Sequence, residues 1–241
     1  TVSDGLTEFI FSLKLKSRSM YRLEFKFSSH KSWLDKFAEN LSKLAGNEVK
    51  AEDNKLVFPP DFANGQFEFI ELSEGLGVLK INCTFNQDLM LTRASTADNE
   101  NLYWHFNISL ERLKGDEKSP VTIDNNLDKF VLHSSSLLKE QLLFPAKRKI
   151  RILTVVATRA WLLKLIHDYK IPQIGIVKSY MSNKPVYKSY HFINNCYLHA
   201  HRILDSRLNP LIQEKFLTGE VVLLLSDFFR HNREVEQDDN F

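Results

Sequence analysis

The fold is decided by the stretch FEFIELSEGLGVLKINCTF, which covers residues 67–85. Its second half places apolar side chains at every second position, at Leu79, Ile81, Cys83 and Phe85. Successive side chains of a strand point to opposite faces, so this period of two predicts a strand with one apolar face. Ser73-Glu74-Gly75, between the two halves, is a turn signal. The stretch therefore predicts a β-hairpin.

Short stretches of the same kind continue on both sides of this hairpin. They are separated by polar segments and lie at residues 11–27, 88–93, 102–108, 121–123, 129–133, 140–144 and 150–156. One helix is predicted before the hairpin, over residues 33–44, because apolar residues recur there at spacings of three and four, and Gly46 ends it. Short strands at this spacing indicate a sandwich or small barrel rather than alternating strands and helices.

The pattern changes to helices after the last predicted strand. Thr158 can cap a first helix that carries Trp161, and two longer helices are predicted over residues 193–208 and 211–233. The tail that follows is acidic and polar, as in a linker. The sequence thus predicts a β module at residues 1–157, a helical module at 158–233 and a linker at 234–241.

The composition argues against several classes of protein. The formal net charge is only +2, whereas a domain that grips duplex DNA by itself usually has a strong basic excess. Cys83 and Cys196 lie far apart in sequence, so a disulfide framework is not expected. No apolar run approaches the roughly 18 residues needed to span a bilayer, and the first residues lack a signal-peptide pattern. We therefore expect a cytoplasmic protein without a membrane segment.

The order of these segments resembles the N-terminal region of AraC-type transcriptional regulators over most of residues 67–231. The matching text is FEFIELSEGL (67–76), FNQDL (85–89), HSSSL (133–137), FP (144–145), RAWL (159–162) and the closing helix from Asn209-Pro210 to Phe229. The resemblance implies a cupin-like (jelly-roll) β-barrel that binds a small effector, followed by a helical region that forms a homodimer. It also implies a DNA-binding domain with two helix-turn-helix units. Nothing in the sequence matches that domain, so we expect it to be encoded beyond Phe241.

A candidate effector site follows from the strands that can line a barrel interior. Small-molecule sites are mostly apolar with a few polar groups. The apolar candidates are Phe69, Leu79, Ile81, Phe85, Trp104 and Phe106, and the polar candidates are Arg93, Tyr103 and His105. A core that is simply filled by side chains, with no ligand, is the alternative. No cofactor is predicted.

The last predicted helix is a candidate for dimerisation, because its apolar stripe is wider than one packing partner requires. The residues expected to meet a second copy are Leu217, Val221, Leu224, Leu225 and Phe228. A helix buried within a single chain is the alternative. A plain dimeric scaffold would also fit these features.

The main rival function is a metal-dependent cupin enzyme, which needs two histidines at alternate positions of a strand and further ligands. The one His-x-His pair, His199 and His201, falls in a predicted helix, where residues two apart point to different faces. Cys196 and His199 could share a helical face and hold a metal, although a packed cysteine beside a surface histidine explains them more simply. Ser134-Ser135-Ser136 beside His133 fits a polar turn better than a catalytic nucleophile.

Overall fold

The computed structural model describes residues 20–97, 100–111, 130–171, 178–180, 184–191 and 193–238. Strands come first and most helices last. The elements are β1 (Tyr21–Phe25), α2 (Trp33–Ala45), β2 (Lys50–Glu52), β3 (Lys55–Val57), β4 (Ala63–Ser73), β5 (Leu76–Phe85), β6 (Leu89–Arg93), β7 (Asn101–Glu111), β8 (Phe130–Ser135), β9 (Glu140–Phe144), β10 (Lys149–Thr158), α3 (Arg159–Asp168), β11 (Tyr187–His191), α5 (Asn194–Asp205) and α6 (Pro210–Asp238).

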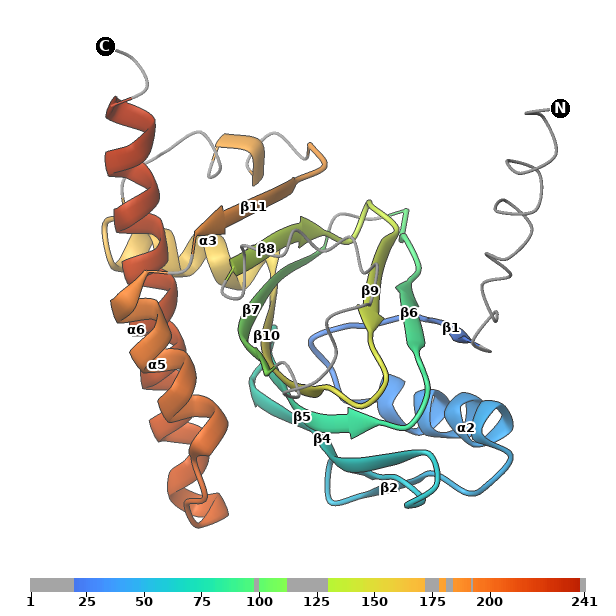
Figure 1. The fold of residues 1–241 in the computed structure, drawn as a ribbon. Helices are drawn as coiled ribbons and strands as arrows, with labels where there is room; N and C mark the ends of the chain where they lie inside the picture. Colours follow the sequence, from blue (N-terminus) through green and yellow to red (C-terminus); the bar gives the residue numbers. More distant parts are fainter. Residues whose placement is uncertain are drawn as a thin grey trace, which may run out of the picture.

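The strands form two sheets that face each other (Figure 1). The large sheet has the order β11-β8-β7-β10-β5-β4-β3-β2, and the small sheet has the order β1-β6-β9. Among the described strands, β1 with β6 is the single parallel pair. No strand pairing within the described ranges joins the two sheets, so these strands do not close into a barrel. The chain is thus a mixed α/β protein dominated by antiparallel sheets.

The hairpin predicted at residues 67–85 is confirmed as β4 and β5, which pair antiparallel. Gly75 occupies its turn with a φ of 81°, a conformation that favours glycine. The predicted apolar face of β5 is also confirmed, because Leu79, Ile81, Cys83 and Phe85 are buried together. Val78 points to the other side of the sheet and is equally buried in a second core. The large sheet is therefore covered on both faces at β5.

The first core fills the space between the two sheets, which we call the cup. Side chains of β4 and β5 meet Leu89 and Leu91 of β6 and Phe144 of β9 there. The helix predicted at residues 33–44 is confirmed as α2, and it adds Trp33 and Phe37 to the same core. Gly46, at a φ of 71°, ends α2 by donating its N–H to the Ser42 carbonyl.

The second core lies on the opposite face of the large sheet, which we call the outer face, between β5, β7 and β10 and the helices. In Figure 1, α6 and α5 stand side by side along this face. Thr158 caps α3 as predicted, since its side chain accepts a hydrogen bond from the Trp161 N–H. Of the described helices, none is long and apolar enough to cross a membrane.

Two details differ from the sequence-based expectations. The chain from Tyr187 to His191 forms β11, an edge strand of the large sheet, although no strand was predicted there. Helix α6 continues to Asp238, so residues 234–238 extend the helix that was expected to end at residue 233. Glutamate and glutamine, which are common in this tail, are good helix formers. The strand predicted at residues 121–123 and most of the one at 11–27 fall outside the described residues.

Candidate ligand site inside the cup

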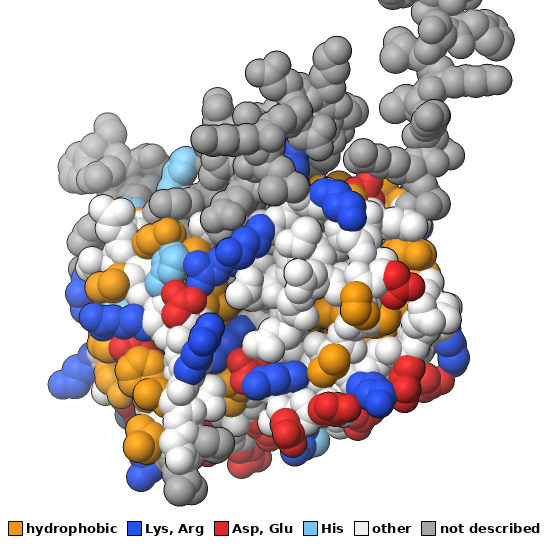
Figure 2. Space-filling view, turned by 60° about the horizontal axis from the view of Figure 1, so that its bottom comes forward, with side chains coloured by type: hydrophobic (Ala, Val, Ile, Leu, Met, Phe, Trp, Pro, Cys, Tyr) orange, Lys and Arg blue, Asp and Glu red, His pale blue; other side chains and the backbone are white. Residues whose placement is uncertain are grey.

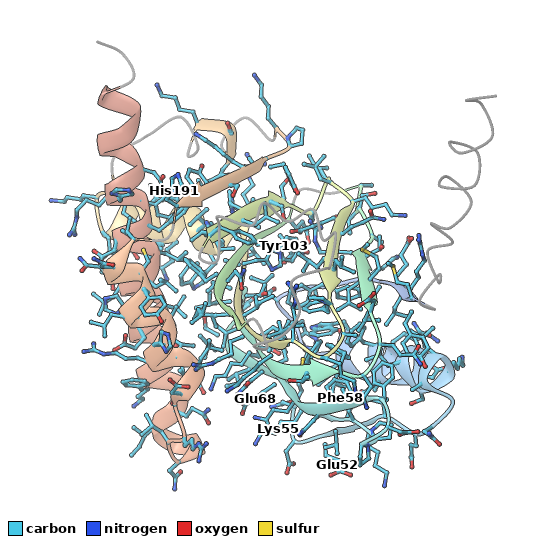
Figure 3. All side chains as sticks on the ribbon, in the orientation of Figure 1. Glu52, Lys55, Phe58, Glu68, Tyr103 and His191 are labelled. Atoms are coloured by element: carbon cyan, nitrogen blue, oxygen red, sulfur yellow. The ribbon has the colours of Figure 1, made fainter. Side chains whose placement is uncertain are left out.

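Strand β7 divides its side chains between the cup and the outer face. Tyr103 belongs to the core of the cup, as Figure 3 shows, and His105 lines the cavity there. Trp104 and Phe106 point the other way and belong to the outer core. The expectation that Trp104 and Phe106 line a ligand site inside the barrel is therefore wrong. A strand that places Tyr103 and His105 inside must place its other side chains outside.

The remaining predicted apolar residues do come together in the cup. Phe69, Ile81 and Phe85 are all buried there. Aromatic rings dominate this space, for example where Phe27 stacks on Tyr103 with ring centroids 5.4 Å apart. The walls of the cup are thus mainly aromatic and aliphatic.

A charged pair lies at one end of this apolar interior. Arg93 and Glu140 are direct neighbours across β6 and β9, and they are only 4% and 2% exposed. Arg93 donates from Nη2 to Glu140 Oε2 at 3.0 Å and from Nε to the same oxygen at 3.3 Å. The Arg93 guanidinium also lies 4.1 Å from the centroid of the Tyr103 ring, within the range of a cation–π contact. A buried charge needs such partners.

Residues of the large sheet complete what we call the polar cluster, which consists of Arg93, Glu140, His105, Ser134 and Thr154. Ser134 donates to Glu140 Oε2 at 2.7 Å, and His105 Nε2 lies 3.2 Å from Glu140 Oε1. His105 Nδ1 and the Thr154 hydroxyl form a hydrogen bond of 2.8 Å. The cluster therefore joins the small sheet to the large one through polar contacts.

Glu140 is ionised within this cluster. Burial by itself would raise its pKa, but the neighbouring His105, Arg93 and the Ser134 hydroxyl outweigh burial and lower the pKa to about 2. The carboxylate balances the Arg93 charge, so the pair as a whole is neutral.

The cup contains a cavity of about 20 Å³ beside the polar cluster, which is room for roughly one water molecule. Its lining residues are Phe25, Phe27, Trp33, Phe37, Phe67, Leu79, Ile81, Leu91, Arg93, His105, Glu140, Leu142, Phe144 and Thr154. Sites for drug-sized ligands usually enclose about 300–1,000 Å³. In this conformation the cup is thus nearly filled by its own side chains, and a larger ligand needs it to open.

Sequence reasoning found Arg93, Tyr103 and His105 but missed Glu140, Ser134 and Thr154. A signal for Glu140 exists in the sequence. Glu140 is the first residue of a predicted strand, and an acidic residue in a strand often pairs with a basic residue on a neighbouring strand. The sequence predicts a polar turn at Ser134, yet Ser134 lies within β8 and is fully buried. Its burial depends on the partner sheet, which local sequence does not reveal.

The residues expected at a dimer interface lie inside the chain. Leu217, Val221, Leu224, Leu225 and Phe228 are all buried in the outer core, where α6 packs on the large sheet and α5. The expectation that this face meets a second copy is wrong, because the face is already occupied. The opposite side of α6 exposes Ile212 and Leu223, which are 61% and 50% accessible.

Metal-ligating side chains do not gather in the part of the chain that the structure describes. There, no group of three or more His, Cys, Asp or Glu residues could hold a metal ion. Cys196 is buried with its Sγ 3.7 Å from the Leu224 carbonyl oxygen. His199 bonds through Nδ1 to Glu220 at 2.6 Å, with Asp227 3.7 Å from Nε2. These pairs hold α5 against α6.

A larger hollow lies outside the cup, between the β4–β5 turn and α3. This groove has a volume of about 1120 Å³ and is open to solvent. Arg159 and Lys164 line it together with Glu74, Glu100 and Asp168. Figure 2 likewise shows basic and acidic side chains interspersed over one face of the molecule. The cup differs from the groove because its polar groups are enclosed and converge on one point.

Comparisons of the chain with protein-family models, with curated proteins and with solved structures found no match.

Proposed function

We propose that this chain is the effector-sensing and dimerisation part of an AraC-type transcriptional regulator. The observation that carries the proposal is the nested pairing of strands, followed by helices packed on the outer face. In this proposal the protein works in the cytoplasm as a homodimer and reaches DNA through a separate C-terminal domain.

The nested pairing supports a cupin-like jelly roll. A jelly roll is a long antiparallel ribbon wrapped over two facing sheets, so its first strand pairs with its last and each following strand with the preceding one. Here β5 pairs with β10, β6 with β9 and β7 with β8, and all three pairs are antiparallel. The middle pair lies in the small sheet and the other two in the large sheet. This alternation between sheets is what the wrapped ribbon requires.

Strand β7 and the neighbouring β8 give a physical route between the cup and the helices. On one side, His105 of β7 and Ser134 of β8 contact Glu140. On the other side, Trp104 of β7 packs edge-on against Phe229 of α6, with centroids 6.3 Å apart, and stacks on His133 of β8. A ligand that moves the polar cluster therefore shifts the packing of α6. In the intact regulator this shift would favour one arrangement of the two DNA-binding domains.

The coding sequence beyond Phe241 tests this proposal. We expect it to continue in frame and to encode two consecutive helix-turn-helix units. A stop codon directly after Phe241, or a domain of another kind, would contradict the regulator.

A further inference from the structure

Three residues that line the cavity in the cup each carry a buried polar atom that makes no hydrogen bond with the described residues, although one of these atoms, Glu140 Oε1, has an ion-pair contact with His105 Nε2 at 3.2 Å. The three atoms are the Trp33 indole Nε1, Arg93 Nη1 and Glu140 Oε1. All three side chains are more than nine-tenths buried. A buried donor or acceptor without a partner lowers stability, so native proteins rarely keep several together.

These three atoms define the hydrogen-bonding groups that a ligand needs at this site. Trp33 and Arg93 offer N–H donors, and Glu140 offers an acceptor. A hydroxyl group can pair with the donors and with the acceptor, because its oxygen accepts hydrogen bonds while its own O–H donates one. The Arg93 charge is already balanced by Glu140 at 3.0 Å, so a negatively charged group would place two anions beside one cation. The matching ligand is therefore neutral.

The rest of the cavity favours an aromatic molecule. Phe25, Phe27, Phe37, Phe67 and Phe144 contribute rings to its wall. Trp33 and Phe37 both come from α2, a single helix that covers one side of the cup. Displacement of the Phe37 side chain can enlarge the cavity without breaking a strand pairing, while Trp33 stays in place to bind the ligand.

We propose that the cup binds a small, neutral, hydroxyl-bearing aromatic molecule, with the hydroxyl group between Trp33, Arg93 and Glu140. This assignment rests on the proposed sensor function and names the chemical class of its effector. The ring lies among the phenylalanines, and the hydroxyl group accepts from the Trp33 and Arg93 N–H groups and donates to Glu140 Oε1.

Phenol is the probe for this site, with benzoate and benzene as matched probes of similar size. Phenol is neutral at pH 7, benzoate is anionic, and benzene lacks the hydroxyl. Binding is measured by NMR from the indole N–H resonances of the whole chain. Because the cavity is small, Phe37→Ala serves as a second receptor that enlarges it without removing a polar atom. Dispersed NMR spectra confirm that each variant is folded.

We expect phenol to shift the Trp33 indole resonance and to bind Phe37→Ala about tenfold more tightly than the unaltered chain. In Phe37→Ala, phenol should exceed both benzene and benzoate by roughly tenfold in affinity, the effect of about one net hydrogen bond. Adding Trp33→Phe to Phe37→Ala should reduce the preference for phenol over benzene several-fold. Trp161→Phe, on α3 outside the cup, should leave it unchanged.

Two results would overturn the assignment: equal or tighter binding of benzoate, or no phenol binding to either receptor up to its solubility limit. Such a failure remains separable from the regulator proposal. Helix-turn-helix units encoded after Phe241 would preserve that role even if phenol fails. Conversely, a phenol-binding cup without those units would remove only the regulator.

Discussion

Glu140 holds the polar cluster together, since Arg93, His105 and Ser134 all direct polar atoms at its carboxylate. Its position on the small sheet, facing partners on the large sheet, makes it the residue through which the two sheets share a buried charge. A buried charge without a partner lowers the stability of the fold. Loss of Glu140 would leave Arg93 in this state, and loss of Arg93 would leave Glu140 in it.

Glu140→Gln should change the acid dependence of stability. The pKa of Glu140 in the folded chain is about 2, against an ordinary value of 4.5. Its contribution is thus fully present above pH 4.5 and is lost as the pH falls towards 2, a change of about 3 kcal/mol. The variant should lose this part of the pH dependence, and at pH 7 it should be less stable by about 3–5 kcal/mol, because Arg93 stays buried without its partner.

The measurement is chemical denaturation between pH 7 and 2.5. Glu24→Gln, which breaks an exposed ion pair with Lys139, is the matched control and should behave like the unaltered chain. An identical pH profile for Glu140→Gln would show that the cluster does not hold an ionised carboxylate.

His133 should make the stability of the fold depend on pH at pH values higher than those at which Glu140 acts. It donates from Nδ1 to the Tyr103 carbonyl oxygen and accepts from the Tyr180 hydroxyl, and complete burial lowers its pKa to about 3. A histidine that folding keeps neutral contributes stability above its ordinary pKa of 6.5, and this is lost as the pH falls towards 3. We expect a loss of about 2 kcal/mol between pH 6.5 and 5. His133→Gln should flatten this slope in denaturant titrations, whereas exposed His167→Gln should preserve it.

At the scale of elements, neighbouring leucines distinguish the two sides of α6. Leu224→Glu should destabilise the chain by at least about 3–5 kcal/mol, because it places a carboxylate in the outer core. Leu223→Glu, on the exposed side, should leave the melting temperature nearly unchanged. If α6 mediates the proposed dimer, Leu223→Glu should also convert it into a folded monomer in light scattering. A cooperative melt of Leu224→Glu at the unaltered temperature would contradict the packing of α6.

Two glycines give opposite predictions for the same substitution. Gly65 of β4 has a φ of 115°, and a Cβ there would collide with the Asn82 carbonyl oxygen on β5. Gly219 lies in α6, where a Cβ would meet open space. Gly65→Ala should therefore lower the melting temperature, while Gly219→Ala should raise stability by about 1 kcal/mol through helix propensity. Thermal unfolding of both variants tests the register of β4 on β5, and a tolerated Gly65→Ala would refute it.

The elements were more predictable from sequence than the faces they bury. Helix α2 and hairpin β4–β5 have clear periods, but the LYWHF part of β7 is apolar or aromatic at nearly every position. Such a strand is buried on both sides, so its sequence does not reveal whether Trp104 or Tyr103 points into the cup. For the same reason the broad stripe of α6 did not reveal which side meets the sheet. Edge strand β11 is largely exposed and has no apolar alternation to predict it.

At the scale of the molecule, the large sheet is a wall shared by two cores. The cup contains the polar cluster, and the outer core contains the packing of α5 and α6. Because β5, β7 and β10 are buried on both sides, a shift of these strands in one core also changes the packing in the other. In the proposed regulator, this arrangement would let a ligand inside the cup change the packing of the helices outside it.

The most direct test of the regulator is to sequence the DNA that the intact protein binds in its own cells. The account predicts discrete genomic sites, each with two related half-sites separated by about one helical turn or a multiple of it. It also predicts that Glu140→Gln changes occupancy at those sites. Recovery of no DNA above the level of an untagged strain would contradict the account.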